Sequence, residues 1–584
     1  MNGAAAIEEV VRAWGIRTVF SLSGAQHAPV LDVFDRGGYR IVGGRTESGV
    51  VGAADGYARV SGRPGLALII AGQGLVNAVA GLACAQLAGS PVVVLVARPP
   101  LGAEEAAGSE LHWSTACAEP VVKWCRTVKR RERLAEFVEM AMAVATAGRP
   151  GPAVLAIPSD LLWADGPGAG REPGAGPRQV PLPAAVDPAA VQDVTRVLAG
   201  RRRPVCVVGP SARREGVGSE ELSRLRDVLG FPIVGEGAGR GILAEDFEHC
   251  FSWPVAQTAL AQADFVLAVG CRLDRQVSWL RPPWTDRSAF IAEVTRTPEA
   301  AAWGRLPDRI VVGELAHVVD GLVAATEQLG WQPDPPAWMG EALRERLAAV
   351  DAVADELGAG LNPIAIARRL MAALRQPAVF VGDGADTLSW AHGVIRLGQG
   401  GLWLDHRPLG SMGTGFPLAI GAAAAEEEAR GAGEPGRPVV LLTGDGAFGY
   451  QLAELETASR CHLPLSIIVA NDGAWGTEYH GQLRAVGRAI NTELTQARYD
   501  LAAQGLGCQG VLARDIEELD AALARVGQDG PSPLLVNVPT DLDSGRLRKE
   551  QPLLQMIFHD DVMLREAQAE SDIQFSRAQR DGAP

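Results

Sequence analysis

Short apolar strand patterns alternate with helical patterns through three successive blocks of this 584-residue chain. The clearest strands of the first block read TVFSL (18–22), GLALIIAG (65–72) and PVVVLVA (91–97), and VVLLTG (439–444) and LSIIVAN (465–471) stand out in the last. Strands that alternate with helices join into right-handed βαβ units, which build a parallel sheet. We therefore predict an α/β protein with three doubly wound parallel-sheet domains.

Two segments rich in Gly and Pro divide the chain, because neither can hold a helix or a central strand. The first spans residues 165–188, and the second lies around GWQPDPPAW (330–338). Three domains also agree with the usual size of about 100–200 residues per domain. The predicted boundaries are 1–164 for the first domain, 165–188 for a linker, 189–330 for the central domain, 331–359 for a second linker, 360–545 for the third domain and 546–584 for a C-terminal tail or lid.

The charge balance argues against nucleic-acid and membrane partners. The formal net charge of −15 offers no basic surface for a nucleic acid or an anionic membrane. The first twenty residues carry acidic groups where a secretion signal needs a basic end. The apolar stretch SPVVVLVA (90–97) is much shorter than the roughly 20 residues that span a bilayer. The eight cysteines form no CxxC pair, so we expect reduced thiols and a cytoplasmic location.

Gly-Asp-Gly occurs twice in the third block, at 382–384 and at 444–446. Each copy directly follows an apolar strand, and ligands of parallel sheets bind beyond the carboxyl ends of the strands. After the second copy, a helical pattern leads to a strand that ends at Asn471 and Asp472. No strand ending in an acid or amide follows the first copy, which we interpret as a plain turn.

The second copy predicts a magnesium site. The strand order would bring Asp445 and Asp472 to one edge of the sheet, and Mg²⁺ is usually bound by one or two carboxylates together with phosphate oxygens. A helix is predicted to begin just after the turn, so the backbone amides of Gly446, Ala447 and Phe448 would receive those phosphates. The expected ligand is thus a phosphate-bearing small molecule held through a metal ion.

The stretch GDGAFGYQLAELETASRCHLPLSIIVANDGAWG (444–476) resembles the diphosphate-binding motif of thiamine diphosphate enzymes. The resemblance implies that Asp445, Asp472 and the carbonyl group of Ala474 hold Mg²⁺. This sequence differs from the common pattern because Asp472 stands where Asn is usual. The resemblance also implies contacts to the cofactor from Gly444, Trp475 and Gly476.

A second stretch, GGRTESGVVGAADGYARVSGRPGLALIIAGQG (43–74), resembles the N-terminal domain of the same family. The family normally reads Arg-His-Glu, then Ala-Asp-Gly-Tyr-Ala-Arg, then Gly-Pro-Gly. The resemblance implies that Glu47 hydrogen-bonds the pyrimidine ring of the cofactor and promotes loss of the thiazolium proton. Thr46 replaces the usual His, and Gln73 replaces the Pro in the loop that carries Asn77 toward the cofactor.

A third stretch, LGSMGTGFPLAIGAA (409–423), resembles the segment that supports the thiazolium ring. The resemblance implies that Met412 wedges beneath this ring and keeps the cofactor bent, with Gly410 beside it. The family builds each active site from two subunits, so Glu47 of one chain would serve Asp445 of another. A homodimer is the minimum expected assembly, and a tetramer remains open.

Within the family, the chain looks most like the branch of acetohydroxyacid synthases, 2-hydroxyacyl-CoA lyases and oxalyl-CoA decarboxylases. SELHW (109–113) stands where synthases tend to show Phe-Gln-Glu. The leading hypothesis is a 2-hydroxyacyl-CoA lyase that yields formyl-CoA and an aldehyde or ketone. The alternative is a carboligase, an acetolactate synthase-like transferase acting on 2-oxo acids. A remote alternative is a regulatory subunit that binds the cofactor without catalysis.

Other candidate residues depend on the family layout alone. Glu110 falls where oxalyl-CoA decarboxylases keep an active-site Glu, and Glu493 and Gln26 lie in loops expected to face the thiazolium ring. The central domain would hold CoA or ADP, FAD, or no nucleotide. Four arginines are candidates for a phosphate contact there: Arg213, Arg214, Arg272 and Arg275.

Overall fold

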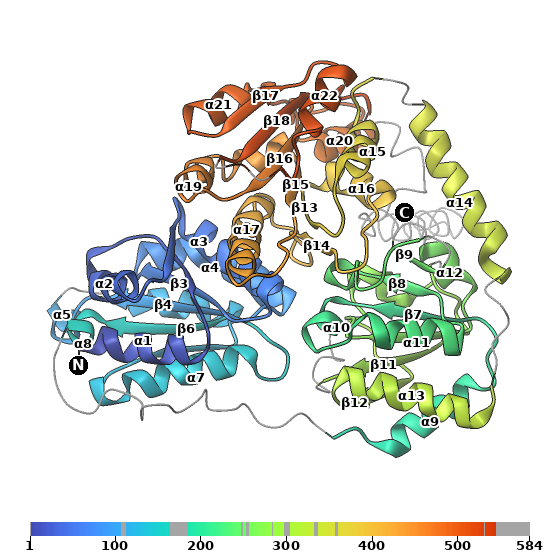
Figure 1. Ribbon diagram of the computed structural model, residues 1–584, viewed down its shortest axis with the longest axis horizontal. Coiled ribbons are helices and arrows are strands. Elements are labelled where there is room, and N and C mark those ends of the chain that lie inside the picture. The colour runs from blue at the N-terminus through green and yellow to red at the C-terminus, as the bar shows by residue number, and fades with distance from the viewer. Residues whose placement is uncertain are drawn as a thin grey trace, which may run out of the picture.

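In the computed structural model, three parallel β-sheets of six strands each are arranged as three blocks (Figure 1). This confirms the predicted α/β class with three doubly wound sheets. In Figure 1 the first block is blue to cyan, the central block is green, and the third runs from yellow to red. The structure describes residues 2–106, 112–163, 185–246, 249–252, 256–282, 284–296, 304–331, 337–356, 360–528, 530 and 532–544.

The first block has the strand order β2-β1-β3-β4-β6-β5. Its strands are β1 (Thr18–Ser21), β2 (Arg40–Gly43), β3 (Gly65–Ile70), β4 (Val92–Arg98), β5 (Trp124–Thr127) and β6 (Ala153–Pro158). Its helices are α1 (Gly3–Ala13), α2 (Ala28–Arg36), α3 (Glu47–Ser61), α4 (Gln73–Ala88), α5 (Leu101–Ala106), α6 (His112–Ala118), α7 (Leu134–Thr146) and α8 (Ser159–Trp163). The order in which successive strands are added to the sheet reverses between β1 and β3, and this reversal creates a crevice at their carboxyl ends.

The third block repeats the same connectivity in the order β14-β13-β15-β16-β18-β17. Its strands are β13 (Val379–Asp383), β14 (Leu402–Asp405), β15 (Val439–Gly444), β16 (Leu465–Asn471), β17 (Gln509–Leu512) and β18 (Leu534–Pro539). Its helices are α15 (Pro363–Ala373), α16 (Ala385–Val394), α17 (Gly415–Gly431), α18 (Asp445–Gly449), α19 (Glu454–Arg460), α20 (Gly476–Val486), α21 (Tyr499–Gly505) and α22 (Ile516–Leu523). Here the corresponding crevice lies between β13 and β15.

The central block has the order β12-β11-β10-β7-β8-β9, so its crevice lies between β7 and β10. Its strands are β7 (Pro204–Val208), β8 (Ile233–Gly235), β9 (Cys250–Ser252), β10 (Phe265–Val269), β11 (Phe290–Thr295) and β12 (Arg309–Val312). Its helices are α9 (Pro188–Leu198), α10 (Pro210–Arg214), α11 (Ser219–Leu229), α12 (Ala256–Gln262), α13 (Leu315–Leu329) and α14 (Ala337–Glu356). Helix α14 falls within the segment predicted as the second linker. Its side chains Met339 and Leu343 are buried in a hydrophobic core of the central block.

One hydrophobic core runs continuously from the first sheet to the third. Side chains alternate between the two faces of a strand, and in β13 the alternation directs Val379 and Val381 into this shared core while Phe380 enters a separate one. Phe20 and Val42 of the first sheet belong to the shared core too. The first and third blocks therefore stabilise each other by burying apolar surface together.

Helices α3 and α17 form the centre of that shared core, where glycines let their backbones approach closely. A Cβ atom on Gly421 of α17 would overlap the carbonyl oxygen of Ala53, and one on Gly56 of α3 would overlap that of Leu418. Figure 1 shows α17 lying directly beside the first block. The tight crossing requires glycine at both positions.

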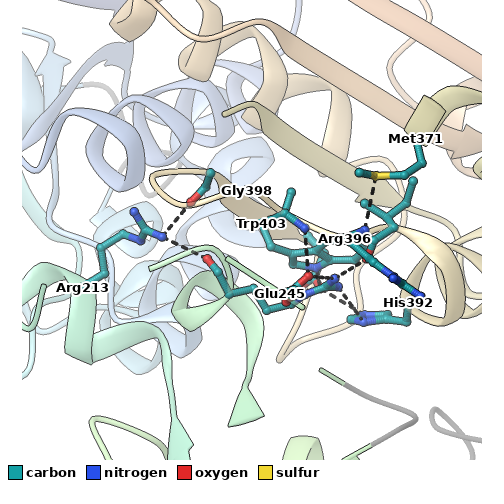
Figure 2. A network of polar contacts seen from close by, with 12 residues as sticks. Arg213, Glu245, Met371, His392, Arg396, Gly398 and Trp403 are labelled. Carbon is teal, nitrogen blue, oxygen red and sulfur yellow. Dashed lines mark hydrogen bonds and ion pairs between the residues drawn. The ribbon is translucent and has the colours of Figure 1, made fainter. Parts of the chain in front are cut away.

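The central block is joined to the third by a buried polar network (Figure 2). Arg240 is 1% exposed, donates through Nε and NH2 to the Glu245 carboxylate at 2.7 and 2.8 Å, and lies 3.9 Å above the centre of the Trp403 ring. The His392 ring lies between two guanidinium groups, with Nδ1 3.3 Å from Arg240 NH1 and Nε2 2.8 Å from Arg407 NH2. A buried charge is tolerated only when it is paired and hydrogen-bonded, and this network satisfies that condition across a domain boundary.

No helix among the residues that the structure describes is long and apolar enough to cross a membrane. This finding agrees with the interpretation of SPVVVLVA as a strand, because residues 92–98 form β4 in the middle of the first sheet.

We expect Gly421→Ala to destabilise the protein by about 1–3 kcal/mol, because the added methyl group forces the α3–α17 crossing apart. Gly431→Ala is the matched control, since Gly431 ends the same helix and nothing lies within 4 Å of the position of its Cβ. Thermal unfolding of both variants measures the effect. Equal unfolding temperatures for Gly421→Ala and the wild type would contradict the close-packing account.

Candidate active site

A cavity of about 330 Å³ opens at the carboxyl edge of the third sheet, in the crevice between β13 and β15. Cavities of this size hold small molecules and cofactors. Residues of the third block form nearly all of its lining, and Arg275 of the central block adds one side chain. The lining includes ten residues predicted to bind the cofactor: Gly410, Met412, Gly444, Asp445, Gly446, Ala447, Asp472, Ala474, Trp475 and Gly476.

Asp445 and Asp472 face each other at the mouth of this crevice. Asp445 begins α18 directly after β15, and its Oδ2 accepts a hydrogen bond from Gly473 N at 3.1 Å. Asp472 follows the last residue of β16, and its Oδ1 accepts one from Ala474 N at 3.1 Å. Because β15 and β16 are adjacent parallel strands, their carboxyl ends meet at this edge.

Burial raises the pKa of both carboxyl groups above the ordinary range for Asp. The negative charges of Asp445 and Asp386 raise the pKa of Asp472 further. Two buried carboxylates at hydrogen-bond distance cannot both be ionised at little cost unless a proton or a cation lies between them. The arrangement therefore favours a bound cation.

The donor set fits Mg²⁺ better than a metal held by protein alone. Among the described residues, no group of three or more His, Cys, Asp or Glu side chains is placed to hold a metal ion. Mg²⁺ is bound by one or two carboxylates and completes its oxygen shell with phosphates and water. Two carboxylates beside a cavity that admits a phosphate-bearing ligand meet this requirement.

The strand-like segment after Asp472 pairs with the loop that carries Glu493. Ala474 and Glu493 form an isolated antiparallel bridge, in which Trp475 N donates to Thr492 O at 2.8 Å and Leu494 N to Gly473 O at 2.6 Å. Glu493 is exposed next to the cavity wall. The Trp475 ring covers Gly446 so closely that a Cβ there would lie 2.7 Å from it, which explains the second glycine of this Gly-Asp-Gly turn.

Met412 lies on a loop that two glycines in the left-handed region shape, with φ of 82° at Gly410 and 83° at Gly413. A side chain at Gly413 would overlap Tyr450. Met412 is 37% exposed and lines the cavity. An exposed apolar side chain at a cavity wall is placed to contact a ligand. Phe448, in contrast, is 1% exposed and packs against Phe416 and Tyr499, so its side chain belongs to the core.

The first Gly-Asp-Gly turn contributes more than its sequence interpretation as a plain turn suggested. The expectation that no strand ending in an acid follows it was wrong, because β14 ends at Asp405. Asp383 is 1% exposed and its carboxylate accepts hydrogen bonds from Gly384 N at 2.8 Å and Gly415 N at 2.7 Å. Asp386 and Thr387, just after the turn, line the cavity. The strand order could have indicated this role. The order reverses between β13 and β15, as it does between β1 and β3, so the carboxyl ends of β13 and β15 form the two sides of one crevice.

Glu47 lies in the first block as the opening residue of α3. It is 7% exposed, and its Oε2 accepts a hydrogen bond from Asn77 Nδ2 at 3.1 Å. Asn77 and Gln73 are exposed on α4, and Gln26 is half-buried in the short 3-10 helix η1 (Ala25–His27). All four residues follow strands of the first sheet, and none of them lines the 330 Å³ cavity. Glu110 lies outside the described residues.

The four candidate arginines separate into three environments. Arg214 and Arg272 line a crevice of about 60 Å³ where the three blocks meet, together with Arg149. Burial and the neighbouring charges of Arg272 and Arg214 lower the pKa of Arg149 to about 10. Arg213 instead donates to the backbone carbonyls of Ala238, Arg240 and Gly401, and Arg275 lines the larger cavity.

Comparison with known proteins identifies the blocks as a set of three family domains. Three family models of thiamine pyrophosphate enzymes match this chain. The model of the N-terminal TPP binding domain matches residues 1–117, that of the central domain 191–322, and that of the C-terminal TPP binding domain 383–538.

Curated relatives extend the match to nearly the whole chain. The 2-hydroxyacyl-CoA lyase 2 of Homo sapiens is 28% identical over 579 residues, which cover 92% of this chain and 90% of the relative. The acetolactate synthase large subunit of Mycobacterium tuberculosis is 30% identical over 555 residues, which cover 93% and 96%. Among solved structures, a thiamine diphosphate-dependent 4-hydroxybenzoylformate decarboxylase of Rhodococcus jostii shares the fold with a TM-score of 0.77 at 22% identity, over 93% of this chain and all of that one.

We expect Asp472→Asn to stabilise the metal-free protein at high pH. The folded-state pKa of Asp472 is raised, so the wild type loses stability as the pH rises from the unfolded pKa of about 3.9 toward the folded value. The variant lacks this loss, so its gain in unfolding temperature should be absent at about pH 4 and largest at about pH 8. Because Asn is the usual residue of the family pattern at this position, the variant should still be stabilised by Mg²⁺ with thiamine diphosphate, but by less than the wild type, since it loses one negative charge beside the cation.

Thermal unfolding in EDTA, and then with Mg²⁺ and thiamine diphosphate, measures both effects. Asp35→Asn is the control, because Asp35 is an exposed carboxyl on α2. A gain for Asp472→Asn that does not depend on pH would contradict the electrostatic account.

Proposed function

Because this chain belongs to the thiamine pyrophosphate enzyme family, we propose that it acts as a 2-hydroxyacyl-CoA lyase with thiamine diphosphate and Mg²⁺ in the cavity of the third block. It is a thiamine diphosphate-dependent enzyme of the kind that cleaves or forms carbon–carbon bonds. The observation that carries the proposal is the buried pair Asp445 and Asp472 at the edge of a cofactor-sized cavity.

The metal would be held by Asp445, Asp472 and the carbonyl oxygen of Ala474. The raised pKa values of the two carboxyl groups support this role, because a divalent cation relieves their repulsion. The diphosphate would lie against the glycine-lined wall formed by Gly444 and Gly446. When bound, thiamine diphosphate stabilises negative charge on a carbonyl carbon, which permits the adjacent carbon–carbon bond to break or form.

Glu47 would hold a proton against the pyrimidine ring, and Met412 would support the thiazolium ring. Glu47 suits this role because its carboxyl group is nearly buried and oriented by Asn77 Nδ2. Gln73 would lie beside the same ring as Asn77.

We propose that two chains build each active site. Glu47 does not line the cavity of its own chain. The apolar side chain of Met412 is exposed at the cavity wall, and those of Leu409 and Tyr450, which do not line the cavity, are exposed as well. Exposed apolar groups beside a site favour contact with another protein surface. A homodimer in which Glu47 of one subunit serves Asp445 of the other accounts for both observations, and a tetramer of two such dimers is compatible with them.

The crevice where the three blocks meet supports a phosphate-bearing group. Arg214 and Arg272 lie there beyond the carboxyl ends of β7 and β10, the position where doubly wound folds bind nucleotides, and Arg149 of the first block joins them. All three also donate to backbone carbonyl groups in the last turn of α4. At about 60 Å³ the crevice holds only a few water molecules, so it suits one phosphate of a CoA or ADP moiety better than FAD. This favours an acyl-CoA substrate over a simple 2-oxo acid.

Three further residues would act near the substrate. Glu493 is exposed beside Ala474 at the cavity wall, and Gln26 lies at the carboxyl edge of the first sheet. Glu110 would move a proton of the substrate hydroxyl group. The protein would work in the cytoplasm, where its eight free cysteines remain reduced.

A product assay tests the substrate class. With thiamine diphosphate and Mg²⁺, we expect formyl-CoA and an aldehyde or ketone to give a 2-hydroxyacyl-CoA, and pyruvate to give no acetolactate. Liquid chromatography with mass spectrometry measures both products. Acetolactate from pyruvate without acyl-CoA product would instead assign the acetolactate synthase activity that the relative of Mycobacterium tuberculosis carries by name.

A subunit-mixing experiment tests the shared site. We expect Glu47→Gln and Asp445→Asn homodimers to be inactive by themselves and to regain about one quarter of the wild-type activity after subunit exchange. In a mixed dimer one site would contain both substitutions and the other neither, because the sites of a symmetric dimer are related by its two-fold axis. Continued inactivity after exchange, with mixed dimers shown by native mass spectrometry, would assign each site to a single chain.

A further inference from the structure

The turn that precedes Glu47 is held by a carboxylate from the third block. Glu454, the first residue of α19, is 2% exposed. Its Oε1 accepts hydrogen bonds from the backbone nitrogens of Arg45 at 3.0 Å and Thr46 at 3.1 Å, and its Oε2 accepts one from Thr457 Oγ1 at 2.7 Å. One buried carboxylate thus fixes two consecutive backbone amides across a domain boundary, through the stronger, charge-assisted kind of hydrogen bond.

Thr46 extends this contact to the start of α3. Its hydroxyl group accepts a hydrogen bond from Gly49 N at 3.0 Å, which makes Thr46 the N-cap of the helix, and it donates to Gln451 Oε1 at 2.9 Å. Gln451 Nε2 in turn donates to Ser48 Oγ at 3.2 Å. The residues on both sides of Glu47 are therefore tied to the same side chain of the third block.

The contact leaves the turn little room to move. A Cβ atom on Gly49 would lie 2.5 Å from Glu454 Oε1 and 2.7 Å from Thr46 Oγ1. The backbone of α3 therefore reaches Glu454 only because residue 49 is a glycine. A hydroxyl group at position 46 is part of the same fit, and this chain carries it where the family pattern has His.

We propose that Gln451 and Glu454 are positioning residues, which hold the Thr46 turn and so set the place of the Glu47 carboxyl group. The inference rests on the proposed role of Glu47 toward the cofactor. Glu47 directly follows Thr46, so a shift of the turn moves its carboxyl group by the same amount. A misplacement of about 1 Å in a reacting group can cost on the order of 100-fold in rate.

The segment that makes the positioning contact also contributes to both active sites of the proposed dimer. Gln451 and Glu454 follow Asp445 in the same segment, which continues from the end of β15 through α18 into α19. In the proposed dimer this segment holds the metal of one site and orients the Glu47 that serves the other.

The test uses the assembled enzyme loaded with thiamine diphosphate and Mg²⁺, without substrate. Thr46→Val removes the hydroxyl group and keeps the shape of the side chain, whereas Thr46→Ser restores the hydroxyl group. The first readout is the rate at which the proton on C2 of the thiazolium ring exchanges into D₂O, followed by NMR after acid quench. The second is the cofactor affinity from titration calorimetry. Glu454→Ala and Glu454→Gln form a second pair, because the amide keeps an acceptor oxygen.

We expect Thr46→Val and Glu454→Ala to slow the exchange by about 10- to 100-fold, with cofactor affinity changed by no more than about threefold. Thr46→Ser and Glu454→Gln should recover most of the rate. Ser459→Ala is the control on the same helix, since the Ser459 hydroxyl group donates to Gly507 O of the third block at 2.8 Å, and it should exchange as the wild type does.

Wild-type exchange in folded Thr46→Val and Glu454→Ala variants would overturn the positioning roles of Gln451 and Glu454, while loss of exchange in Glu47→Gln would leave the proposed function standing. If Glu454→Ala fails to fold, the Thr46 pair decides alone. Wild-type exchange in Glu47→Gln would instead overturn the proposed role of Glu47 itself.

Discussion

The close packing of α3 against α17 is the constraint on which the arrangement of the candidate site depends. Glycines at the crossing let the two backbones approach, and a single hydrophobic core then spans the first and third sheets. Helix α3 begins at Glu47, and α17 begins just after the Met412 loop. The packing of the two helices thereby fixes, within one chain, the distance between the Glu47 that would serve one active site of the proposed dimer and the Met412 loop that belongs to the other.

The second constraint is electrostatic. Asp386, Asp445 and Asp472 gather at one edge of the third sheet, and burial together with mutual repulsion raises the pKa of Asp472. Such a cluster is costly without a cation, because desolvated like charges repel strongly. A divalent ion with a diphosphate turns the same charges into ligands and neighbours of ligands. In the proposed site, Asp472 in place of the usual Asn would make the dependence on metal stronger than the common pattern requires.

The fold class and many of the cavity-lining residues could be predicted from the sequence, because strand patterns and local motifs are encoded in contiguous residues. Several edge strands escaped prediction, among them β9 (CFS) and β17 (QGVL), since short strands without a strong apolar run have little periodicity to detect. The sequence analysis also missed Asp386 and the hydrogen bonds that Gln451 and Glu454 make with the Thr46 turn. Their roles depend on which strands and helices become neighbours in space, and a single sequence states that only indirectly.

Strand β14 shows how the fold couples separate sites. Side chains of an extended segment alternate between its two sides. Trp403, Asp405 and Arg407 therefore line the crevice between the three blocks, and His406 between them lines the cofactor-sized cavity. The same segment receives the buried Arg240 and His392 network shown in Figure 2. A group bound in the crevice would contact one side of this segment, and its other side faces the cavity. The two sites therefore share a structural element without sharing a residue.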